Sequence, residues 1–461
     1  MKYVSTRGEA PELGFEDVLL TGLARDGGLY VPGQWPILTP DELRNLRGHS
    51  YQDVACLVVS KFMGGAVPEP DLKRMIAEAY AGFGHPAVAP LKQMDSNQWL
   101  LELFHGPTLA FKDIAMQLLA RLMDWSLKKR GQHATIVGAT SGDTGGAAID
   151  AFKDSNYATT VILHPHGKVS NVQRRQMTTV NSPSIHNIAI EGNFDDCQAI
   201  VKALFNDTVF RDRVGLAGVN SINWARIMAQ IVYYVSSAVA LGSPDRKVSY
   251  CVPTGNFGDI FAGLAAKRMG LPVDRLIIAT NVNDILDRTL KTGRYEMQGV
   301  HASSSPSMDI QVSSNFERLL YLAYGRDTGA IRSLMAGLSQ SGSFTISQKE
   351  LATIRAEFDS TAVGEAETAQ TIAQTLRRTG ELLDPHTAVG FAAALKAKPG
   401  ASALVTLATA HPAKFPDAVE KASGIRPNLP PRLIHLLNAK ERFTILPNSA
   451  AVVRDFVLAL K

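Results

Sequence analysis

Short apolar segments alternate with amphipathic segments along most of this chain, and this alternation restricts the folds open to it more than any other feature. Strand-like runs lie at residues 134–140 (ATIVGAT), 159–165 (TTVILHP) and 185–192 (IHNIAIEG), with helix-like runs between them. Strands that alternate with helices form parallel sheets with right-handed crossover connections. The alternation resumes at residues 247–255 (KVSYCVPTG). We therefore predict an α/β fold with two parallel-sheet lobes.

The rest of the sequence predicts a third domain before these lobes. Residues 1–95 contain turn-forming glycines and prolines, as in ARDGGLYVPGQWP, and two helical patterns but no strand–turn–helix repeat. We assign them to an N-terminal domain, and we place the first α/β lobe at residues 96–245 and the second at residues 246–461. The uncharged stretch at residues 227–244 contains Gln230, two tyrosines and a proline. Such a composition favours a buried helix over a membrane span.

Composition and charge exclude several classes of function. The chain has 47 basic and 43 acidic residues among 461, and its formal charge of +4 is too dilute to indicate nucleic acid or an anionic membrane as a partner. Its three cysteines are far apart and lack metal-ligand spacing, so we expect neither a disulfide framework nor a zinc site. The N-terminus lacks the apolar run of an export signal. We expect a cytoplasmic protein that binds no metal.

Two glycine-rich turns, each between a strand and a helix, could bind anions. They are SGDTGG at residues 141–146 and GNFGD at residues 255–259. Unpaired backbone N–H groups and the helix dipole favour an anion at such a turn. A single turn of this kind is more often a tight strand-to-helix connection. Neither turn matches the GxGxxG dinucleotide fingerprint or the P-loop pattern, so the sequence disfavours a nucleotide.

Lys112, in the string HGPTLAFKD, lies where a helix begins. A cation in the first turn faces the positive end of the helix dipole, which lowers the pKa of its amine. The apolar neighbours Leu109, Ala110 and Phe111 favour the same shift, and a lysine with a lowered pKa can form a Schiff base with a carbonyl. The alternative is a solvated lysine without a chemical role. A reactive lysine next to anion-binding turns suggests pyridoxal phosphate as the cofactor.

A series of motifs runs along nearly the whole chain. They are STRG and ARDGGLYVP near the start, then FHGPTLAFKD, ATSGDTGGAA, HPHGKVSNVQRRQM, NSINWARIMAQIVYY, PTGNFGDIFAG, DPHTAVG and TAHPAKF. In this order and approximate spacing, the motifs resemble those of the threonine synthases, of the longer type that carries an extra N-terminal domain. That family is part of the fold-type II pyridoxal phosphate enzymes, so the resemblance implies their two-lobed α/β fold.

The resemblance implies a role in cofactor binding for several positions. Lys112 would carry pyridoxal phosphate as a Schiff base and would then move protons at the substrate carbons. Thr409, in TAHPAKF, would meet the pyridine nitrogen, where other folds of these enzymes use an aspartate. The GNFGD turn would bind the cofactor phosphate, chiefly with main-chain amides, through Gly255, Asn256, Phe257 and Asp259.

The resemblance also implies a substrate and a reaction, the conversion of O-phospho-L-homoserine and water to L-threonine and phosphate. The substrate carboxylate would be held at the other turn, where Asp143 would shape the loop, by residues Ser141, Gly142, Asp143 and Thr144. The substrate phosphate needs a pocket of its own. Arg226, in NSINWARI, is a candidate for it, with Arg174, Arg175 and Lys414 as alternatives. Each arginine could instead form a surface ion pair.

Two other functions stay open. A serine or threonine ammonia-lyase would share the lysine and both turns, although the N-terminal domain and the strings LAFKD and TAHPAKF favour the synthase. A catalytically silent relative would bind a phosphorylated ligand, although the retention of Lys112 with both turns argues against it. His164, His166 and His386 have no partner at metal-ligand spacing. We expect a small-molecule substrate, no nucleic-acid or membrane partner, and a monomer or homodimer.

Overall fold

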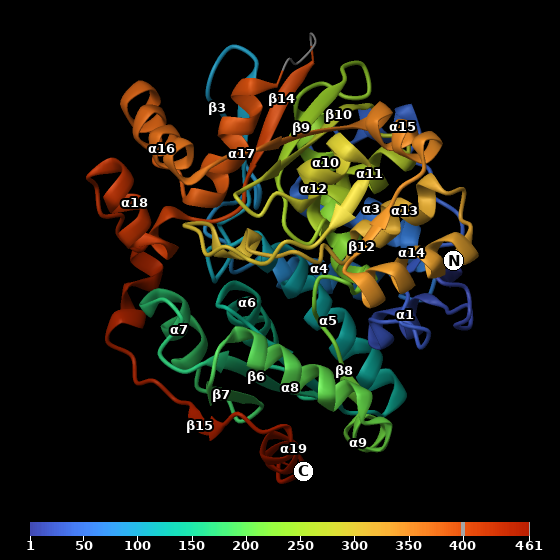
Figure 1. The fold of residues 1–461 in the computed structure, drawn as a ribbon, viewed down its shortest axis with the longest axis vertical. Helices are drawn as coiled ribbons and strands as arrows, with labels where there is room; N and C mark the ends of the chain where they lie inside the picture. Colours follow the sequence, from blue (N-terminus) through green and yellow to red (C-terminus); the bar gives the residue numbers. More distant parts are fainter. Residues whose placement is uncertain (398–401, 461) are drawn as a thin grey trace.

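Two β-sheets form the two lobes of the chain (Figure 1). The computed structural model describes residues 1–397 and 402–460. Within these residues the strand order is β13-β10-β9-β14-β4-β3 in the large sheet and β15-β7-β6-β5-β8 in the small sheet. All neighbouring strands are parallel except the antiparallel pair β3 and β4. The predicted α/β fold with two parallel-sheet lobes is therefore confirmed.

The strands lie where the apolar runs predict them. Those of the large sheet are β3 (Leu91–Gln93), β4 (Gln98–Glu102), β9 (Val248–Pro253), β10 (Val273–Thr280), β13 (Phe358–Ala362) and β14 (Ala403–Ala408). Those of the small sheet are β5 (Ala134–Ala139), β6 (Ala158–Pro165), β7 (Ile185–Glu191), β8 (Leu216–Ala217) and β15 (Thr444–Pro447). Strands β9 and β14 are buried along their whole length, as expected for a parallel sheet that is covered on both faces.

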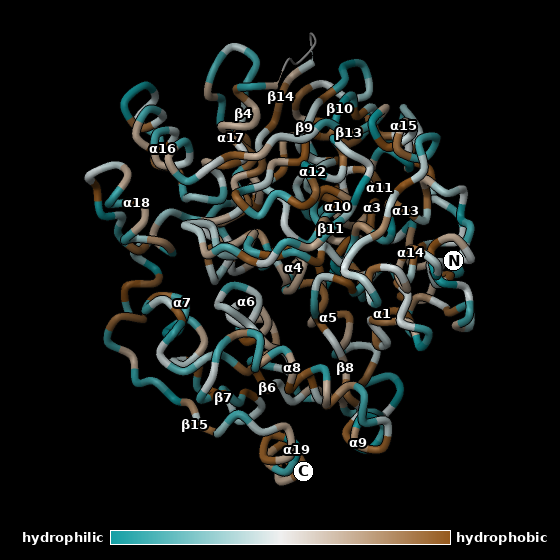
Figure 2. The backbone as a smooth tube through the Cα atoms, in the orientation of Figure 1, coloured by the Kyte–Doolittle hydropathy of each residue, from teal (hydrophilic) through white to brown (hydrophobic). Residues whose placement is uncertain are grey.

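Helices cover both sheets, and hydrophobic residues gather inside while the outer helices α16 and α18 are largely hydrophilic (Figure 2). The helices of the small lobe are α6 (Asp143–Phe152), α7 (Asn171–Thr178), α8 (Phe194–Asn206), α9 (Thr208–Val214) and α19 (Ala450–Leu458). Those of the large lobe are α11 (Gly258–Arg268), α12 (Ile285–Thr292), α13 (Phe316–Ala323), α14 (Thr328–Ser341), α15 (Gln348–Glu357), α16 (Glu365–Thr379), α17 (Pro385–Lys396) and α18 (Pro416–Ser423). Smaller elements are the hairpin of β11 (Arg294–Glu296) and β12 (Ser343–Thr345) and the 3-10 turns η1 (Pro306–Met308), η2 (Pro412–Lys414) and η3 (Pro431–Leu437).

Two long helices, α5 (Lys112–Arg130) and α10 (Trp224–Ala240), pack against each other in the interior. The helix expected from the uncharged stretch at residues 227–244 is α10, and nearly all its residues are buried. Helix α5 begins at Lys112 and ends at Arg130. Gly131, whose φ is 60°, follows it in the left-handed conformation that commonly ends a helix. Among the described residues, no helix is long and apolar enough to cross a membrane.

The N-terminal residues share one core with the rest of the chain. Their elements are β1 (Tyr3–Ser5), α1 (Phe15–Thr21), β2 (Tyr30–Pro32), α2 (Pro40–Asn45), α3 (Tyr51–Met63) and α4 (Glu69–Tyr80). One of the two helical patterns expected in residues 1–95 is α4, which buries Leu72, Met75, Ile76 and Tyr80. The ring of Trp224 in α10 packs against the rings of Tyr3, Trp35 and Phe62. Residues far apart in sequence thus form one hydrophobic cluster.

Two segments cross between the lobes. Strand β4 precedes the small sheet in sequence but pairs with β14 in the large sheet. The C-terminal chain runs from α17 past α18 to the small lobe, where β15 pairs with β7 (Figure 1). Sheet membership therefore does not follow sequence order, and the division at residues 95 and 245 stays a prediction about domains.

Candidate active site

A cleft of about 1840 Å³ lies between the lobes and contains most of the residues that the sequence singles out. Its lining includes Lys112, Arg226, Thr409, the whole GNFGD turn, and Ser141, Thr144 and Gly145 of the SGDTGG turn. The turns follow β5 and β9, and Thr409 follows β14, so all three lie at the carboxyl ends of parallel strands. Ligands of open α/β sheets bind at this edge.

The lysine loop is fixed to the end of β14. The N–H of Phe111 donates to the carbonyl of Thr409 at 2.9 Å, and the N–H of His411 donates to the carbonyl of Leu109 at 3.0 Å. Leu109 has a φ of +63°, which is costly for a leucine and persists only when its surroundings hold it. These two hydrogen bonds hold the loop that carries Lys112 beside Thr409.

The amine of Lys112 is mostly buried and has two polar neighbours. Its Nζ lies 3.4 Å from Oδ2 of Asp143 and 3.4 Å from Oγ of Ser307. Burial lowers the pKa of the amine, Asp143 opposes this by attraction, and the cations Lys414 and Arg226 lower the pKa further. The direction is the one that the sequence predicts, with burial as the largest cause and the neighbouring cations adding to it.

Asp143 holds two ammonium groups in the cleft wall. Its Oδ1 lies 2.9 Å from Nζ of Lys414 and accepts a hydrogen bond from Gln173 at 2.8 Å, while its Oδ2 accepts from Ser307 at 3.0 Å. Burial opposes the ionisation of Asp143, but attraction to Lys414 and Lys112 outweighs it, so the pKa of Asp143 lies well below its usual value. The carboxylate is therefore engaged with cations, and its role in shaping the loop stays a prediction.

The SGDTGG turn presents the start of α6 to the cleft. Gly142 has a φ of 148°, and a Cβ there would meet the side chain of Gln173 at 2.5 Å, so only glycine fits. Thr140 accepts hydrogen bonds from the N–H groups of Gly142 and Gly145, each at 2.9 Å. Ser141 and Thr144 line the cleft. Their hydroxyls and the first amides of α6, which lack intrahelical partners, can receive a carboxylate.

The GNFGD turn is shaped to present main-chain groups. The side chain of Phe257 is buried against Phe316 and Phe358, and its φ of +62° turns the backbone toward the cleft. Asn256 is exposed, and its carbonyl accepts from Nδ2 of Asn315 at 3.0 Å. A Cβ on Gly255 would meet the carbonyl of Ser307 at 2.9 Å. The turn and the start of α11 can therefore bind a phosphate through amides, which fits the phosphate group of pyridoxal phosphate.

Asp259 points away from that amide cradle. Its carboxyl accepts hydrogen bonds from the hydroxyls of Tyr233 and Tyr234 in α10. Its Oδ2 is buried and has no partner among the described residues. Burial raises the pKa of Asp259 to about 7, although the hydrogen bonds of the two tyrosines and the charge of Arg226 lower it. Only the backbone of Asp259, in the first turn of α11, is available to a phosphate.

Sequence reasoning missed Ser307 and gave His386 no role. The N–H of Ser307 donates to Nε2 of His386 at 3.2 Å, and Nδ1 of His386 lies 2.9 Å from the buried carboxylate of Asp384. Nδ1 must then carry the proton, because Nε2 accepts. Ser307 is one of several serines in the loop at residues 301–310, and the sequence does not indicate which of them lies near Lys112. The string DPHTAVG does indicate the pair of Asp384 and His386, because Asp384 caps α17 and its carboxylate also lies within hydrogen-bond distance of His386.

The four basic candidates for a phosphate differ in what they already bind. Arg174 donates to Glu441 at 2.8 Å and Arg175 to the carbonyl of Leu436 at 3.1 Å, and neither lines the cleft. Lys414 is fully buried and donates to the carbonyl of Thr108 at 2.7 Å besides its contact with Asp143. Arg226 is buried and lines the cleft, and its Nε has no partner among the described residues. Burial lowers the pKa of Arg226 to about 10, against the attraction of Tyr233 and Asp259.

A lysine with a lowered pKa, an amide cradle for a phosphate and a threonine hydroxyl in one cleft form a cofactor site, and the sequence comparison agrees. Residues 86–409 match the family described as pyridoxal-phosphate dependent enzyme. Fold and site therefore define a pyridoxal phosphate-dependent enzyme of fold type II. Residues 2–80 and 387–457 match the families described as threonine synthase N terminus and threonine synthase, C-terminal.

Whole-chain relatives narrow this class to one family. A threonine synthase of Pseudomonas aeruginosa is 54% identical over 99% of this chain and 98% of its own length. The crystal structure of a PLP-bound threonine synthase from Brucella melitensis is 60% identical, with a TM-score of 0.98 over 100% of this chain and 99% of that one. The yeast threonine synthase structure is 39% identical, with a TM-score of 0.93 over 100% and 98%. The chain belongs to the threonine synthase family.

Proposed function

We propose that this protein converts O-phospho-L-homoserine and water to L-threonine and inorganic phosphate with pyridoxal phosphate as cofactor. The observation that carries the proposal is a second anion site in the cleft that holds Lys112. Arg226 lines the cleft apart from the amides of the GNFGD turn, and its buried Nε has no partner among the described residues. A phosphorylated substrate and a phosphorylated cofactor require two such sites.

The cofactor would be held by residues that follow three strands of the large sheet, β4, β9 and β14. Lys112 would bind it covalently, the amides of Gly255, Asn256, Phe257 and Asp259 would hold its phosphate, and Thr409 would meet its ring nitrogen. Bound pyridoxal phosphate supplies an electron sink that acidifies the hydrogens next to the substrate's amino group. The raised pKa of Asp259 supports this assignment, because burial disfavours an additional negative charge near the phosphate.

The substrate would lie between the other turn and Arg226. Its carboxylate would accept hydrogen bonds from Ser141 and Thr144 and from the amide of Asp143 at the start of α6, while Gly142, whose amide donates to Thr140, would shape the turn. Its phosphate would accept from Arg226, a buried cleft arginine whose Nε has no partner among the described residues. Interactions at both ends would position the reactive carbons beside Lys112, which converts binding energy into orientation.

Lys112 would move the protons. Its lowered pKa lets Nζ accept a proton from the substrate's α carbon and return it later. The hydroxyl of Ser307 lies within 3.4 Å of Nζ and would orient it, and His386 fixes the backbone of Ser307 in turn. Loss of a β proton with departure of the phosphate from the γ carbon, gain of a proton at the γ carbon and addition of water at the β carbon would complete the reaction.

Phosphate release tests this function directly. The purified holoenzyme should release inorganic phosphate from O-phospho-L-homoserine and form L-threonine in equal amount, and Lys112→Ala should do neither. The formation of 2-oxobutanoate from L-threonine without any phosphate release from phosphohomoserine would instead identify an ammonia-lyase. A plant threonine deaminase structure from Solanum lycopersicum is only 14% identical, with a TM-score of 0.52, and shares the fold alone.

Arg226 offers a test of the substrate-phosphate assignment. Arg226→Lys should lower kcat/KM for phosphohomoserine about 10- to 100-fold, because one strong charge-assisted hydrogen bond is worth about 1.5–3 kcal/mol. The cofactor's absorption band should remain, since Arg226 is not assigned to the cofactor. Arg174→Lys, outside the cleft, is the matched control and should keep the native rate. Loss of the absorption band in Arg226→Lys would reassign this arginine to the cofactor.

We also propose that the enzyme acts in the cytoplasm. Its cysteines Cys56, Cys197 and Cys251 are all free, which suits a reducing compartment. The expectation of a monomer or homodimer stays a prediction, and sedimentation of the purified protein would test it.

A further inference from the structure

Asp384, at the start of α17, is fully buried, and its carboxylate accepts four hydrogen bonds. Oδ1 accepts from the backbone N–H of His386 at 2.9 Å and from its ring Nδ1 at 2.9 Å. Oδ2 accepts from the backbone N–H of Thr387 at 3.2 Å and from the hydroxyl of Thr387. The two bonds from the backbone cap α17. The two bonds from side chains exceed what a helix cap needs.

His386 connects the first of these side-chain bonds to the lysine. Its Nδ1 donates to Asp384, so Nε2 keeps a lone pair and accepts from the N–H of Ser307 at 3.2 Å. The hydroxyl of Ser307 lies 3.4 Å from Nζ of Lys112 and donates to Oδ2 of Asp143 at 3.0 Å. Asp384 thereby reaches the polar contacts of the Lys112 amine through two intermediate residues.

Thr387 connects the second side-chain bond to another part of the site. Its hydroxyl donates to Asp384, so its oxygen can accept the N–H of Thr409 at 3.2 Å. The carbonyl of Thr409 accepts from the N–H of Phe111 at 2.9 Å. Both backbone groups of Thr409 are therefore engaged, which fixes where this residue meets the cleft.

The carboxylate of Asp384 determines the direction of the hydrogen bonds along both connections. An ionised carboxylate only accepts, so the imidazole and the hydroxyl each donate to it and present an acceptor to the backbone N–H beyond. Ser307 and Thr409 provide those N–H groups. An asparagine at this position would turn an NH2 group toward one pair of donors and leave that pair without an acceptor. Asparagine caps helices as well as aspartate does, so α17 alone does not require the carboxylate.

We propose that Asp384 is a positioning residue of the cofactor site and aligns two of its parts together. Through His386 it fixes the serine beside Lys112. Through Thr387 it fixes Thr409. The proposal rests on the roles proposed above for Lys112 and Thr409. Such a site needs its groups held within about 0.5 Å of their working positions by the residues behind them.

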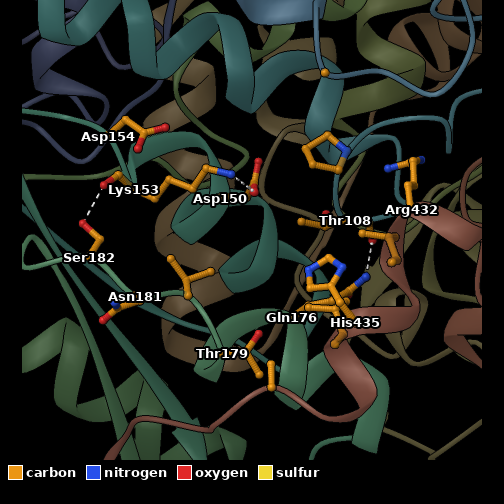
Figure 3. Close-up of a pocket in the computed structure, with 16 residues that line it drawn as sticks. Thr108, Asp150, Lys153, Asp154, Gln176, Thr179, Asn181, Ser182, Arg432 and His435 are labelled. Atoms are coloured by element: carbon orange, nitrogen blue, oxygen red, sulfur yellow. Dashed lines mark hydrogen bonds and ion pairs between the residues drawn. The ribbon is translucent and has the colours of Figure 1, made fainter.

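A separate contact supports the lysine loop at Thr108. The carbonyl of Thr108 accepts from Gln176 at 3.0 Å and from Nζ of Lys414 at 2.7 Å. Thr108 and Gln176 line a second pocket, of about 480 Å³, which Figure 3 shows. The residues that line this pocket do not include Asp384 or its two side-chain partners. A substitution of Asp384 should therefore leave this support of the loop in place.

Cofactor binding tests the role of Asp384. The variant Asp384→Asn is compared with Asp327→Asn, because Asp327 likewise caps α14 through the N–H groups of Gly329 and Ala330. Dialysis of each holoenzyme, followed by visible absorption, measures the dissociation constant of pyridoxal phosphate. We expect this constant to rise about tenfold or more in Asp384→Asn and less than about twofold in Asp327→Asn. Equal values in the two variants would overturn the proposal.

Two further pairs of variants separate the two connections, and they decide the question even if Asp384→Asn does not fold. Thr387→Val loses the hydroxyl and should weaken pyridoxal phosphate binding about tenfold or more, whereas Thr387→Ser should restore it to within about threefold. His386→Leu should slow the return of the absorption band on re-addition of pyridoxal phosphate about tenfold or more. His386→Gln should restore most of that rate, because its amide oxygen can accept from Ser307.

Equal behaviour of the two variants at Thr387, or of the two at His386, would also overturn the proposal. None of these measurements uses phosphohomoserine. Failure of the positioning role and failure of the native protein to release phosphate are therefore distinguishable.

Discussion

At the scale of single residues, the site is a buried cluster with more cations than anions. Asp143 is ionised and pairs with both Lys112 and Lys414, while Arg226 adds a third cation and Asp259 has a raised pKa. An excess of buried positive charge is unfavourable unless ligands compensate it. The two phosphates and one carboxylate of the proposed complex would do so, which explains why so many cations lie around one lysine.

Asp143→Asn should therefore destabilise the protein strongly. It removes the carboxylate that pairs with the buried ammonium group of Lys414, and breaking a buried ion pair costs about 3–5 kcal/mol. Urea unfolding of the holoenzyme should show a loss of about 3 kcal/mol, and activity should fall as well. Asp455→Asn, an exposed control, should change the unfolding free energy by less than about 0.5 kcal/mol. A loss in Asp143→Asn as small as in the control would show that Lys414 does not need this counter-ion.

Asp259 should make stability depend on pH in the opposite direction from a paired carboxylate. Burial raises its pKa from 3.8 to about 7 in the folded protein, so the folded state holds its proton more tightly than the unfolded state. The contribution of Asp259 to the free energy of unfolding is therefore fully present below pH 3.8 and is lost as the pH rises from there through about 7. The asparagine of the variant Asp259→Asn cannot ionise. The free energy of unfolding of the variant, relative to that of the native protein, should therefore be higher at about pH 8 than at about pH 5 by on the order of 2–3 kcal/mol. Urea unfolding at both pH values measures this gain, and a constant difference between the proteins would contradict it.

At the scale of elements, the C-terminal turn η3 supports the lysine loop. Leu433 and Leu436 form a small hydrophobic cluster with Leu109, the residue with the unfavourable positive φ. Arg432 adds hydrogen bonds to the carbonyls of His105 and Gly106 at the start of the loop. The energy that keeps Leu109 in its conformation thus comes from a segment more than three hundred residues away in sequence.

Leu433→Ala should loosen this support. Truncating a buried leucine costs about 2–5 kcal/mol, and we expect about 2 because Leu433 lies near the surface at 9% exposure. Activity should fall too, since the loop carries Lys112. Leu437→Ala in the same element is the matched control, because Leu437 is 46% exposed and should cost less than about 0.5 kcal/mol. Denaturant unfolding measures the loss of stability, and phosphate release measures the loss of activity. If both losses are the same in the two variants, η3 does not support the lysine loop.

The sequence predicts elements better than it predicts their partners. Lys112 and the GNFGD turn are visible because a lysine at a helix start and a glycine-rich turn have local signatures. The pairing of Asp143 with Lys414 and the approach of Ser307 to Lys112 are not visible, because each depends on a contact between distant segments. The same holds for β15, whose return to the small sheet follows from no local pattern.

At the scale of the whole molecule, the N-terminal residues complete the core of the catalytic lobes. Helix α3 packs on α10 and α4 packs on α5, the helix that begins with Lys112. Trp224 is fully buried among Tyr3, Trp35 and Phe62. Glu317 of the large lobe accepts from Thr6 at 2.6 Å and forms an ion pair with Arg7 at 3.0 Å. The N-terminal part is distinct in sequence, but the apolar faces of α5 and α10 depend on it for their burial.

A chain that starts after residue 86, in an exposed loop, should therefore fail to reach a packed native state. Removing the N-terminal part exposes apolar surface of α5 and α10, and uncovered surface of that kind leaves compact states without fixed side-chain packing. We expect retained far-ultraviolet circular dichroism, lost near-ultraviolet signal and binding of a hydrophobic dye. Fragment 1–86 added in trans should restore the near-ultraviolet signal if folding requires only that surface cover. A truncated chain that unfolds cooperatively by itself and binds pyridoxal phosphate would instead show that the predicted lobes at residues 96–461 are independent of the N-terminal domain.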